Sequence, residues 1–253
     1  FLLTCAVQRG ARYVNALVSD IRLPKDPTAP VEVVYGDGKR YLADAVVGAF
    51  GLHSGLGRRV EALGFGYRSP KPIQACQAEI PLDEAFIRET FRGQIKIFNL
   101  GLPRIRFAAL TPKHRHVTVS VIGKRVSRPD LESFLHHPRV RSHFPPGWQV
   151  PADYCCCHPL LPVTAARRPF SDRLVLIGDA DISRYLKDGI GSAFHTARLA
   201  AWTILHVGQG REDFRRHYYR TTRRRYAWDN LVGKFLFCYN DLISRISLLA
   251  SPH

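Results

Sequence analysis

The spacing of hydrophobic and polar positions predicts a helix, several strands and a second helix in the first quarter of the chain. Residues 1–10 have helical spacing, and residues 11–23 alternate as a strand does. The Gly-Asp-Gly turn at 36–38, between two apolar runs, predicts a hairpin. The second strand of this hairpin is expected to continue through the apolar run 43–51, and a short helix is expected to close near Gly64.

From residue 70 the pattern changes to short β-type segments separated by turns. The segments are "KPIQACQAEIPL", "GQIKIFNLGL", "RIRFAAL" and "HRHVTVSVIG". A helix is expected in "PLDEAFIRETF", and a second in "SRPDLESFLHHP", which begins with a pattern like a capping box. Residues 144–170 are a Pro-rich loop with short extended pieces. An antiparallel sheet is the predicted result.

After residue 170 the chain returns to α/β character. "DRLVLIGD" predicts a buried strand, and long helices are expected at 189–207, 211–228 and 229–249. An antiparallel sheet between two stretches of α/β pattern is typical of a domain inserted into a nucleotide-binding domain.

We therefore predict an α/β fold, in the sense of an α+β mixture, with four segments. Residues 1–69 and 169–207 form a partial Rossmann-like nucleotide-binding domain, residues 70–168 an antiparallel-sheet substrate domain, and residues 208–253 basic, amphipathic C-terminal helices.

The chain is strongly basic, and its positive charge is dense in one region. The chain has 37 Lys and Arg against 21 Asp and Glu, a net charge of +16. Such a field favours nucleic acid, anionic lipid or an anionic cofactor. The one dense cluster is at 211–225, and no known nucleic-acid module surrounds it, so we do not expect nucleic acid as a partner.

The six Cys include no C-x-x-C pair, so neither a disulfide scaffold nor a metal site is predicted. Small buried thiols in a reducing compartment are expected, and with them a cytoplasmic location. Adjacent residues of a strand point to opposite faces, so the side chains of Cys155, Cys156 and Cys157 are expected to alternate between the two faces. The chain has no Met and starts with helical spacing, so we expect it to begin inside a structural unit and to be a fragment.

Candidate chemistry is concentrated in "LVLIGDADISRYLKDGIGSAF", residues 174–194. A carboxylate at Asp179 would lie at the carboxyl edge of a sheet, where open α/β sheets bind ligands. The Gly-x-Gly at 189–191 would let backbone N–H groups approach a ligand at the start of a helix. Candidate cofactor-binding residues are Gly178, Asp179, Ala180, Asp188, Gly189, Ile190, Gly191 and Ser192. Local spacing leaves open an alternative, in which the glycines serve turn geometry alone.

Helical spacing also predicts an apolar stripe along the helix that follows. Its members are Ile190, Phe194, Ala197, Ala201, Ile204 and Leu205.

This stretch, extended to "RLVLIGDADISRYLKDGIGSAFHTARLAA", resembles the Gly-Asp segment of FAD-dependent oxidoreductases of the aromatic-hydroxylase and geranylgeranyl-reductase superfamily. In the reductase branch of the family this segment reads approximately G-D-A, a spacer, then G-E-G-I. Residues 178–180 match G-D-A, residues 188–190 stand where Glu-Gly-Ile is usual, and Lys187 replaces the Gly before it. The resemblance implies FAD as the cofactor. It also implies that Asp179 holds the ribityl chain, and that the Gly-rich helix start lies beside the pyrimidine side of the isoalloxazine ring.

Two further segments carry the same resemblance. "ADAVVGAFGLHSGLGRR" has the frame of the family's second fingerprint in Asp44, Gly48, Ala49, Gly51, Ser54 and Arg58, with Phe50 in place of an Asp. "LPRIRFAALTPKHRHVTVSVIG" is similar to a substrate-domain segment of the reductase branch, and there Pro112 and Lys113 align. For Lys113 we favour a solvated turn residue over a substrate contact.

The family's first fingerprint, G-x-G-x-x-G, which cradles the FAD pyrophosphate, has no match in these residues. Gly-x-Gly starts at 36, 55, 64, 189 and 208, and none continues correctly. We therefore expect the 253-residue chain to bind FAD weakly or not at all.

The resemblance implies an FAD-dependent oxidoreductase that reduces C=C bonds of an isoprenoid-like or other apolar small molecule. An FAD-dependent aromatic hydroxylase is the alternative enzyme. No side chain is assigned as a catalytic acid or base, and Cys76 and residues 155–157 are candidates only for lining a pocket. A non-catalytic basic protein that associates with membrane surfaces is the alternative from another class.

Residues 211–249 carry the evidence for membrane contact. Seven Arg, together with Tyr218, Tyr219, Tyr226 and Trp228, precede an apolar helical face, whose members are Val232, Phe235, Leu236, Tyr239, Leu242, Ile243, Ile246 and Leu249. Lys234, Asp241 and Arg245 interrupt the apolar run, so it is not a spanning helix. An interfacial helix on anionic lipid and a helix packed on the FAD domain with its Arg in solvent both remain open.

Overall fold

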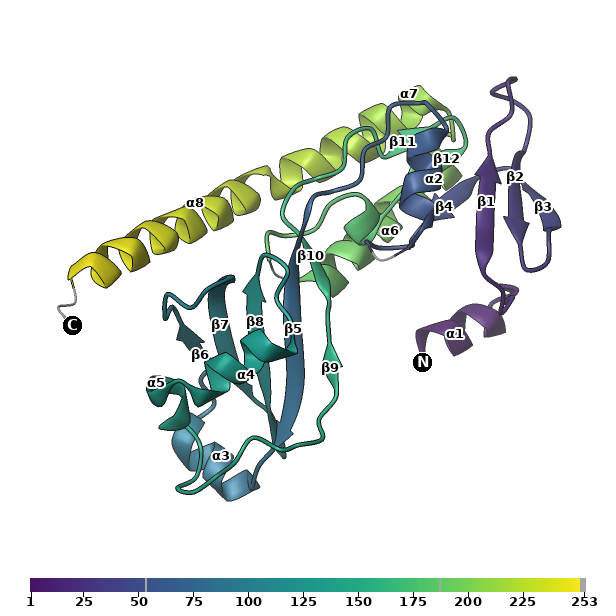
Figure 1. Cartoon of the computed structure of the whole chain (residues 1–253). Helices are drawn as coiled ribbons and strands as arrows, with labels where there is room; N and C mark the ends of the chain where they lie inside the picture. Colours follow the sequence, from purple (N-terminus) through teal and green to yellow (C-terminus); the bar gives the residue numbers. More distant parts are fainter. Residues whose placement is uncertain (53, 187, 251–253) are drawn as a thin grey trace. The chain divides into compact units, whose positions relative to one another are not determined.

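The computed structural model describes residues 1–52, 54–186 and 188–250, with side chains described as far as Tyr239 in the last helix (Figure 1). The chain forms two compact units. The first contains residues 1–69, 166–181 and 194–221, and the second contains residues 70–165, 182–193 and those from 222 onward. The mixture of helices with parallel and antiparallel strands confirms the predicted fold class. The four-segment division stays a prediction.

The first unit contains the predicted hairpin. Strands β1 (Val18–Arg22), β2 (Val31–Tyr35) and β3 (Lys39–Ala43) form an antiparallel sheet in chain order. The turn between β2 and β3 needs positive φ at Gly36 and Gly38, at 54° and 87°, which explains the glycines. The strand predicted over 11–23 is shorter than expected, because pairing with β2 starts only at Val18.

The prediction of one strand running from the hairpin through 43–51 is wrong. The chain leaves the first sheet after Ala43 and enters another as β4 (Val46–Gly48). There β4 lies parallel to β12 (Leu174–Leu176), whose other neighbour is the antiparallel strand β11 (Phe170–Ser171). The backbone N–H of Val46 donates to the carbonyl of Arg173 at 2.7 Å, which fixes the start of the parallel pair.

Strand β12 is buried on both faces. Leu174 and Leu176 pack into a cluster with side chains of β1, β2 and helix α2 (Leu56–Ala62). Val175 and Ile177 pack into a second cluster with Ala200 of α6, Phe214 and Tyr218. Successive residues of a strand point to opposite faces, so four consecutive apolar residues serve two cores.

The helices after β12 differ in part from the expectation. Helix α6 (Gly189–His206) matches its predicted range closely. The two helices predicted at 211–228 and 229–249 are instead the short α7 (Arg211–Asp213), a π-helical segment η2 (Phe214–Tyr219) and one unbroken helix α8 (Arg220–Ala250). No Pro lies between 211 and 250, so nothing interrupts the backbone hydrogen bonds near residue 229.

The second unit contains the predicted antiparallel sheet, with strand order β10-β5-β8-β7-β6 and β9 also on β5. The bounds are β5 (Pro72–Pro81), β6 (Lys96–Phe98), β7 (Ile105–Pro112), β8 (His116–Gly123), β9 (Cys156–Cys157) and β10 (Leu160–Pro162).

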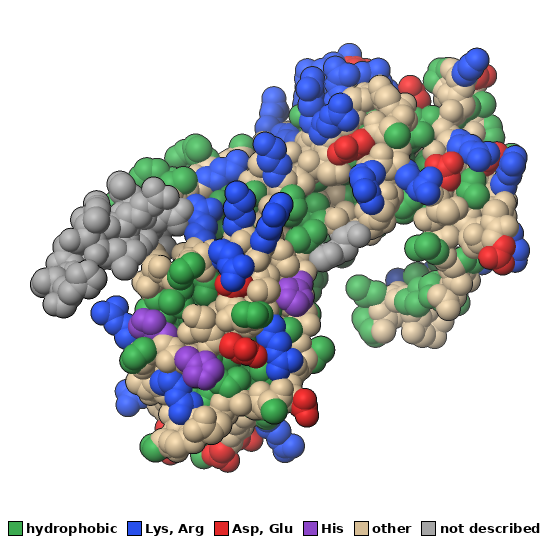
Figure 2. Space-filling view, viewed as in Figure 1, with side chains coloured by type: hydrophobic (Ala, Val, Ile, Leu, Met, Phe, Trp, Pro, Cys, Tyr) green, Lys and Arg blue, Asp and Glu red, His purple; other side chains and the backbone are tan. Residues whose placement is uncertain are grey.

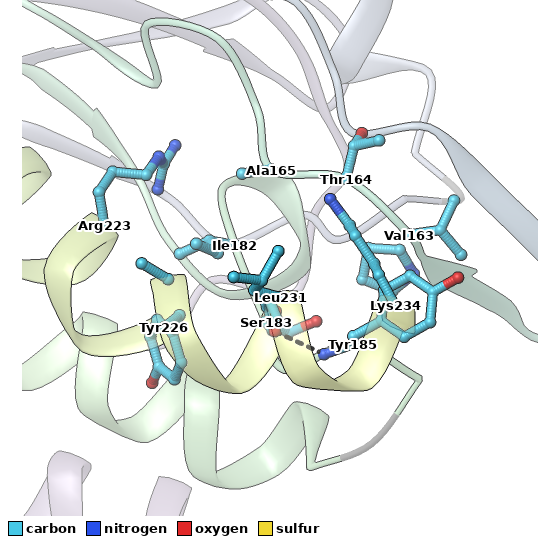
Figure 3. Close-up of a pocket in the computed structure, with 13 residues that line it drawn as sticks. Val163, Thr164, Ala165, Ile182, Ser183, Tyr185, Arg223, Tyr226, Leu231 and Lys234 are labelled. Carbon is cyan, nitrogen blue, oxygen red and sulfur yellow. Dashed lines mark hydrogen bonds between the residues drawn. The ribbon is translucent and has the colours of Figure 1, made fainter. Parts of the chain in front are cut away.

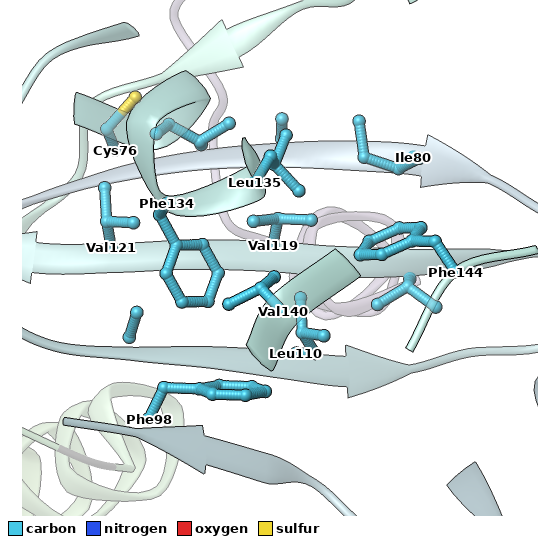
Figure 4. Packing of buried hydrophobic residues seen from close by; sticks show 14 of the residues in the cluster. Cys76, Ile80, Phe98, Leu110, Val119, Val121, Phe134, Leu135, Val140 and Phe144 are labelled. Carbon is cyan, nitrogen blue, oxygen red and sulfur yellow. The ribbon is translucent and has the colours of Figure 1, made fainter. Parts of the chain in front are cut away.

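Three helices accompany this sheet: α3 (Glu84–Phe91), α4 (Arg128–His136) and α5 (Pro138–Arg141). The predicted capping box is confirmed at α4, where the Asp130 carboxylate accepts from the backbone N–H of Ser127 at 2.8 Å. The cap orients α4 so that Leu131, Phe134 and Leu135 are buried on the sheet (Figure 4).

Truncation of Phe134 tests this core. The side chain is fully buried and its ring meets that of Phe98 edge-on at 5.4 Å. We expect Phe134→Ala to lower the free energy of unfolding by about 3–5 kcal/mol in denaturant titrations. The control Ile97→Ala, at a side chain that is 72% exposed, should change it by less than about 0.5 kcal/mol. Equal effects would contradict the described core.

The cysteines follow the expectation only in part. Cys76 is buried in the core of the second unit, and Cys156 is half-buried, while Cys155, Cys157 and Cys238 are exposed. The alternation along 155–157 is as predicted, but burial of all six Cys is not observed. Burial, with a smaller effect of neighbouring Cys156, raises the pKa of the Cys76 thiol to about 12.

Thiol alkylation checks this arrangement. Thiolate is the reactive form, so Cys76 should resist a maleimide in the folded protein at neutral pH, while Cys155 and Cys157 react. Peptide mass spectrometry before and after denaturation gives the measurement. Rapid labelling of Cys76 in the folded protein would disprove its described burial.

Candidate functional site

In the first unit, the candidate site begins where the parallel strands β4 and β12 end. The backbone N–H of Ile177 donates to the carbonyl of Gly48 at 3.0 Å, so the two carboxyl ends lie side by side. A Cβ on Gly48 would lie 2.5 Å from Cδ2 of Leu176, which leaves room only for glycine. After Ile177 the chain turns through Gly178, at a φ of 60°, into the single 3₁₀ turn η1 (Gly178–Ala180).

Asp179 occupies the middle of this turn. Its Oδ1 is buried and has no hydrogen-bond partner among the described residues. A buried polar atom without a partner costs about 1–3 kcal/mol, and more when charged, so such an atom in a native structure calls for an explanation. A ligand that brings a hydroxyl or N–H donor would satisfy it. The turn therefore fits a group with donors, such as the ribityl chain of a flavin.

Hydrogen bonds to buried side chains hold the turn. The N–H of Gly178 donates to Oγ1 of Thr196 at 3.0 Å, and the hydroxyl of Tyr67 donates to the carbonyl of Ala180 at 2.7 Å. Burial raises the pKa of Tyr67 to about 12, so its hydroxyl keeps its proton and remains a donor. The turn is thus fixed on both sides of Asp179.

Asp181, two residues further on, is used differently. Its side chain is fully buried, and Oδ2 accepts from the Tyr218 hydroxyl at 2.7 Å. The same hydroxyl lies 2.7 Å from the carbonyl of Leu176, at the end of β12. Asp181 therefore belongs to the support of the strand and turn.

Sequence reasoning missed four supporting residues, of which Tyr67 belongs to no pattern in the sequence. Thr196 had a signal, because it lies four residues after Ser192 on one face of the predicted helix. Asp181 lies close to the Gly-Asp motif but belongs to no pattern, and Tyr218 comes from a distant basic segment. Only the fold shows that the four lie at η1 or at the residues beside it.

The start of α6, up to Ala193, belongs to the second unit. Asp188 has a φ of 52°, and its Oδ1 accepts from the backbone N–H of Gly191 at 3.0 Å. This is the bond that an N-cap residue makes. A Cβ on Gly191 would collide with Oδ1 of Asp188, so a larger residue would make the Asp188 side chain shift. Ser192 is buried, and its Oγ accepts from the N–H of Arg184 at 3.2 Å.

The predicted residues thus fall into two groups. Gly178, Asp179 and Ala180 are together in η1 of the first unit, and residues 188–192 are together in the second. Gly189, Ile190 and Gly191 are exposed, so their backbone is accessible at the helix start. Asp188 serves as a cap, and Gly191 lies in the first turn of α6 without a positive φ. A cofactor contact by these residues stays a prediction.

The predicted apolar stripe of α6 is only partly packed. Ala197 and Ile204 are half-buried against the cluster around Ala200. In contrast, Ile190 is 90% exposed, and Phe194 and Leu205 are also exposed. The fully buried residues of this helix are small or hydroxylated: Ser192, Thr196, Ala200 and Thr203. Their small volume and their hydroxyls suit a helix that packs closely and donates or accepts hydrogen bonds.

The predicted substrate residues lie in the second unit, at the turn between β7 and β8. Pro112 ends β7, and the N–H of Lys113 donates to the carbonyl of His116 at 2.9 Å. Nζ of Lys113 lies 2.8 Å from the Glu79 carboxylate, and both side chains are about half exposed. This placement agrees with a solvated turn residue, and a substrate contact at Lys113 stays a prediction.

A groove with a volume of about 310 Å³ also lies within the second unit. It runs between the loop after β10, residues 182–185 and one side of α8. Figure 3 shows Arg223 and Lys234, both from α8, at opposite ends of the groove, with the apolar side chains of Ile182 and Leu231 between them. Pockets of this size and apolar lining suit small ligands or part of a larger one.

Residues 182–185 also link this groove to the start of α6. Nε of Arg184 lies 2.8 Å from the carboxylate of Asp229 in α8, and its Nη1 lies 3.4 Å from the Asp188 carboxylate. The groove wall and the helix cap are therefore connected through one guanidinium.

No family model matches the chain. The chain is 24% identical to the chloroplastic geranylgeranyl diphosphate reductase of Nicotiana tabacum over 263 aligned positions, which cover 98% of this chain and 54% of the relative. The chain thus spans about half the length of that relative.

Solved structures share the fold. A geranylgeranyl bacteriochlorophyll reductase-like protein of Thermoplasma acidophilum matches with a TM-score of 0.67 at 15% identity, over 95% of this chain and 62% of that one. The flavin-dependent halogenase CmlS matches with a TM-score of 0.65 at 20% identity, over 89% of this chain and 43% of that one. The comparisons confirm the predicted resemblance: the chain is related to a geranylgeranyl reductase and has the fold shared by such reductases and flavin-dependent halogenases.

Proposed function

We propose that this chain is part of a flavin-dependent oxidoreductase, that the flavin is FAD, and that Asp179 binds its ribityl chain. The observation that carries the proposal is the buried Oδ1 of Asp179, at the carboxyl end of a parallel strand, which has no hydrogen-bond partner in the described part of the chain. Ligands of open α/β sheets bind at that edge. The names of the sequence relative and of the structural neighbours support the same chemistry.

The role of the protein in this proposal is to bind and orient. The η1 turn offers an acceptor already fixed by Tyr67 and Thr196, so little ordering is needed when the ligand arrives. Within the second unit, the exposed start of α6 offers accessible backbone and the positive end of a helix dipole to polar groups of a ligand.

Bound FAD, once reduced, supplies the hydride for the proposed reduction of a C=C bond. We favour reduction over aromatic hydroxylation because the sequence relative is a reductase. The proposed substrate is an isoprenoid-like or other apolar small molecule.

Titration with flavins tests the assignment of Asp179. We expect Asp179→Ala to raise the Kd for FAD at least about tenfold, because a hydrogen bond to a charged acceptor contributes about 1.5–3 kcal/mol. The matched control is Asp37→Asn, at an exposed hairpin turn, which should leave the Kd unchanged. Flavin fluorescence gives the measurement.

Riboflavin provides a second comparison in the same titration. It has the ribityl chain and the ring but no adenosine, and the pyrophosphate fingerprint has no match in these residues. Riboflavin and FAD should therefore bind the 253-residue chain with similar, weak affinity, and both should lose affinity in Asp179→Ala. If the chain bound neither flavin even at high concentration, or if Asp179→Ala bound both as the native chain does, the proposal would be wrong.

A further inference from the structure

Helix α8 exposes an apolar face along its described side chains. The exposed members, spaced three and four residues apart, are Trp228, Leu231, Val232, Phe235, Leu236 and Tyr239. Residues at this spacing lie on one side of a helix. Trp228 is 74% exposed and Phe235 is 67% exposed. We call these six residues the outer α8 face. The side chains of 240–250, where the predicted apolar stripe continues, lie outside those described.

The opposite side of α8 is fixed within the second unit. Asn230 Oδ1 accepts from the N–H of Tyr185 at 2.8 Å, and its Nδ2 donates to the carbonyl of Ser183 at 3.1 Å. The Phe237 ring packs on Phe107, with ring centroids 4.9 Å apart. These contacts determine the rotation of the helix, so the outer α8 face is held outward by the packing of the inner one.

Positive charge lies at the start of the same side. Arg224 and Arg225 are exposed and come four and three residues before Trp228, respectively. Residues 220–239 contain five basic residues and one acidic residue, Asp229, which pairs with Arg184 at 2.8 Å. In Figure 2, hydrophobic side chains are visible along α8 just before its grey end, and Lys and Arg side chains lie toward its start.

We propose that the outer α8 face docks on a membrane surface that contains anionic lipid. Leu231, Phe235 and Leu236 would enter the boundary between headgroups and acyl chains, and the rings of Trp228 and Tyr239 would lie at headgroup level. Arg224 and Arg225 would meet the lipid phosphates. The helix lies parallel to the surface in this arrangement.

Charge complementarity selects lipid over a protein partner. Exposed Arg directly beside a Trp, without an acidic residue on the same face among residues 220–239, matches a surface that is negative outside and apolar beneath. The net charge of +16 attracts the whole chain to such a surface. The proposal does not depend on flavin binding and goes beyond the proposed reaction.

Vesicle sedimentation tests the proposal on the 253-residue chain. The probes are phosphatidylcholine vesicles with and without phosphatidylserine. We expect strong binding only when phosphatidylserine is present, with binding weakened by salt. Trp228→Glu combined with Phe235→Glu should reduce the partition coefficient at least about tenfold, because both apolar anchors are lost and two negative charges are added.

Matched variants separate this effect from general changes. Ile97→Glu places a charge on another exposed apolar residue and should not alter binding. Arg224→Ala with Arg225→Ala should weaken binding several-fold, while Lys25→Ala with Lys39→Ala, an equal loss of charge at exposed sites elsewhere, should weaken it less. Far-UV circular dichroism checks that each variant is folded.

Three results would overturn the proposal. One is equal binding of the native chain and the outer-face variants. Another is no binding to phosphatidylserine vesicles by the folded native chain. The third is concentration-dependent self-association that Trp228→Glu abolishes while vesicle binding is absent, which would assign the face to a second copy of the chain.

Discussion

The parallel pairing of β12 with β4 is the constraint on which the candidate site depends. Four consecutive apolar residues, 174–177, pack alternately into two separate clusters on the two faces of the sheet. A shift of the strand by one residue would therefore move every one of these side chains into the other cluster. Gly48 has no space for a Cβ beside Leu176, so the partner strand is held equally closely. This pairing determines where the strand ends and therefore where the η1 turn begins.

Two carboxylates close in sequence have different roles because their surroundings differ. Asp181 is fully buried and accepts from the Tyr218 hydroxyl, which also bonds to the end of β12. Asp179 lies in the turn that this network supports, and its Oδ1 has no partner among the described residues. The first carboxylate stabilises the fold, and the second is the acceptor that we propose for a ligand.

Much of the fold could be predicted because local chemistry determines it. Positive φ at Gly36 and Gly38 gives the hairpin, Ser127 and Asp130 cap α4, and the apolar run 174–177 gives β12. These features need only neighbouring residues. The resemblance of residues 178–192 to the Gly-Asp segment of FAD-dependent oxidoreductases indicated the candidate site. Of these residues, only 178–180 form the η1 turn.

Other features depended on contacts between distant residues. Nothing near residue 44 in the sequence shows that the chain leaves the first sheet there. The strand that pairs with β4 is β12, which lies more than a hundred residues further along the chain. The buried face of α6 contains Thr196 and Ala200, while the more hydrophobic Phe194 is exposed, so hydrophobic periodicity located the packed side only in part. Tyr218 reaches the site from a segment whose composition suggested only a basic surface.

The most direct test of the central claim is an experimental structure of the chain with FAD or riboflavin bound. Our account predicts a ribityl hydroxyl within hydrogen-bond distance of Oδ1 of Asp179, with the η1 turn still held by Tyr67 and Thr196. A flavin bound away from η1, with Oδ1 of Asp179 satisfied by a donor from the protein itself, would contradict it.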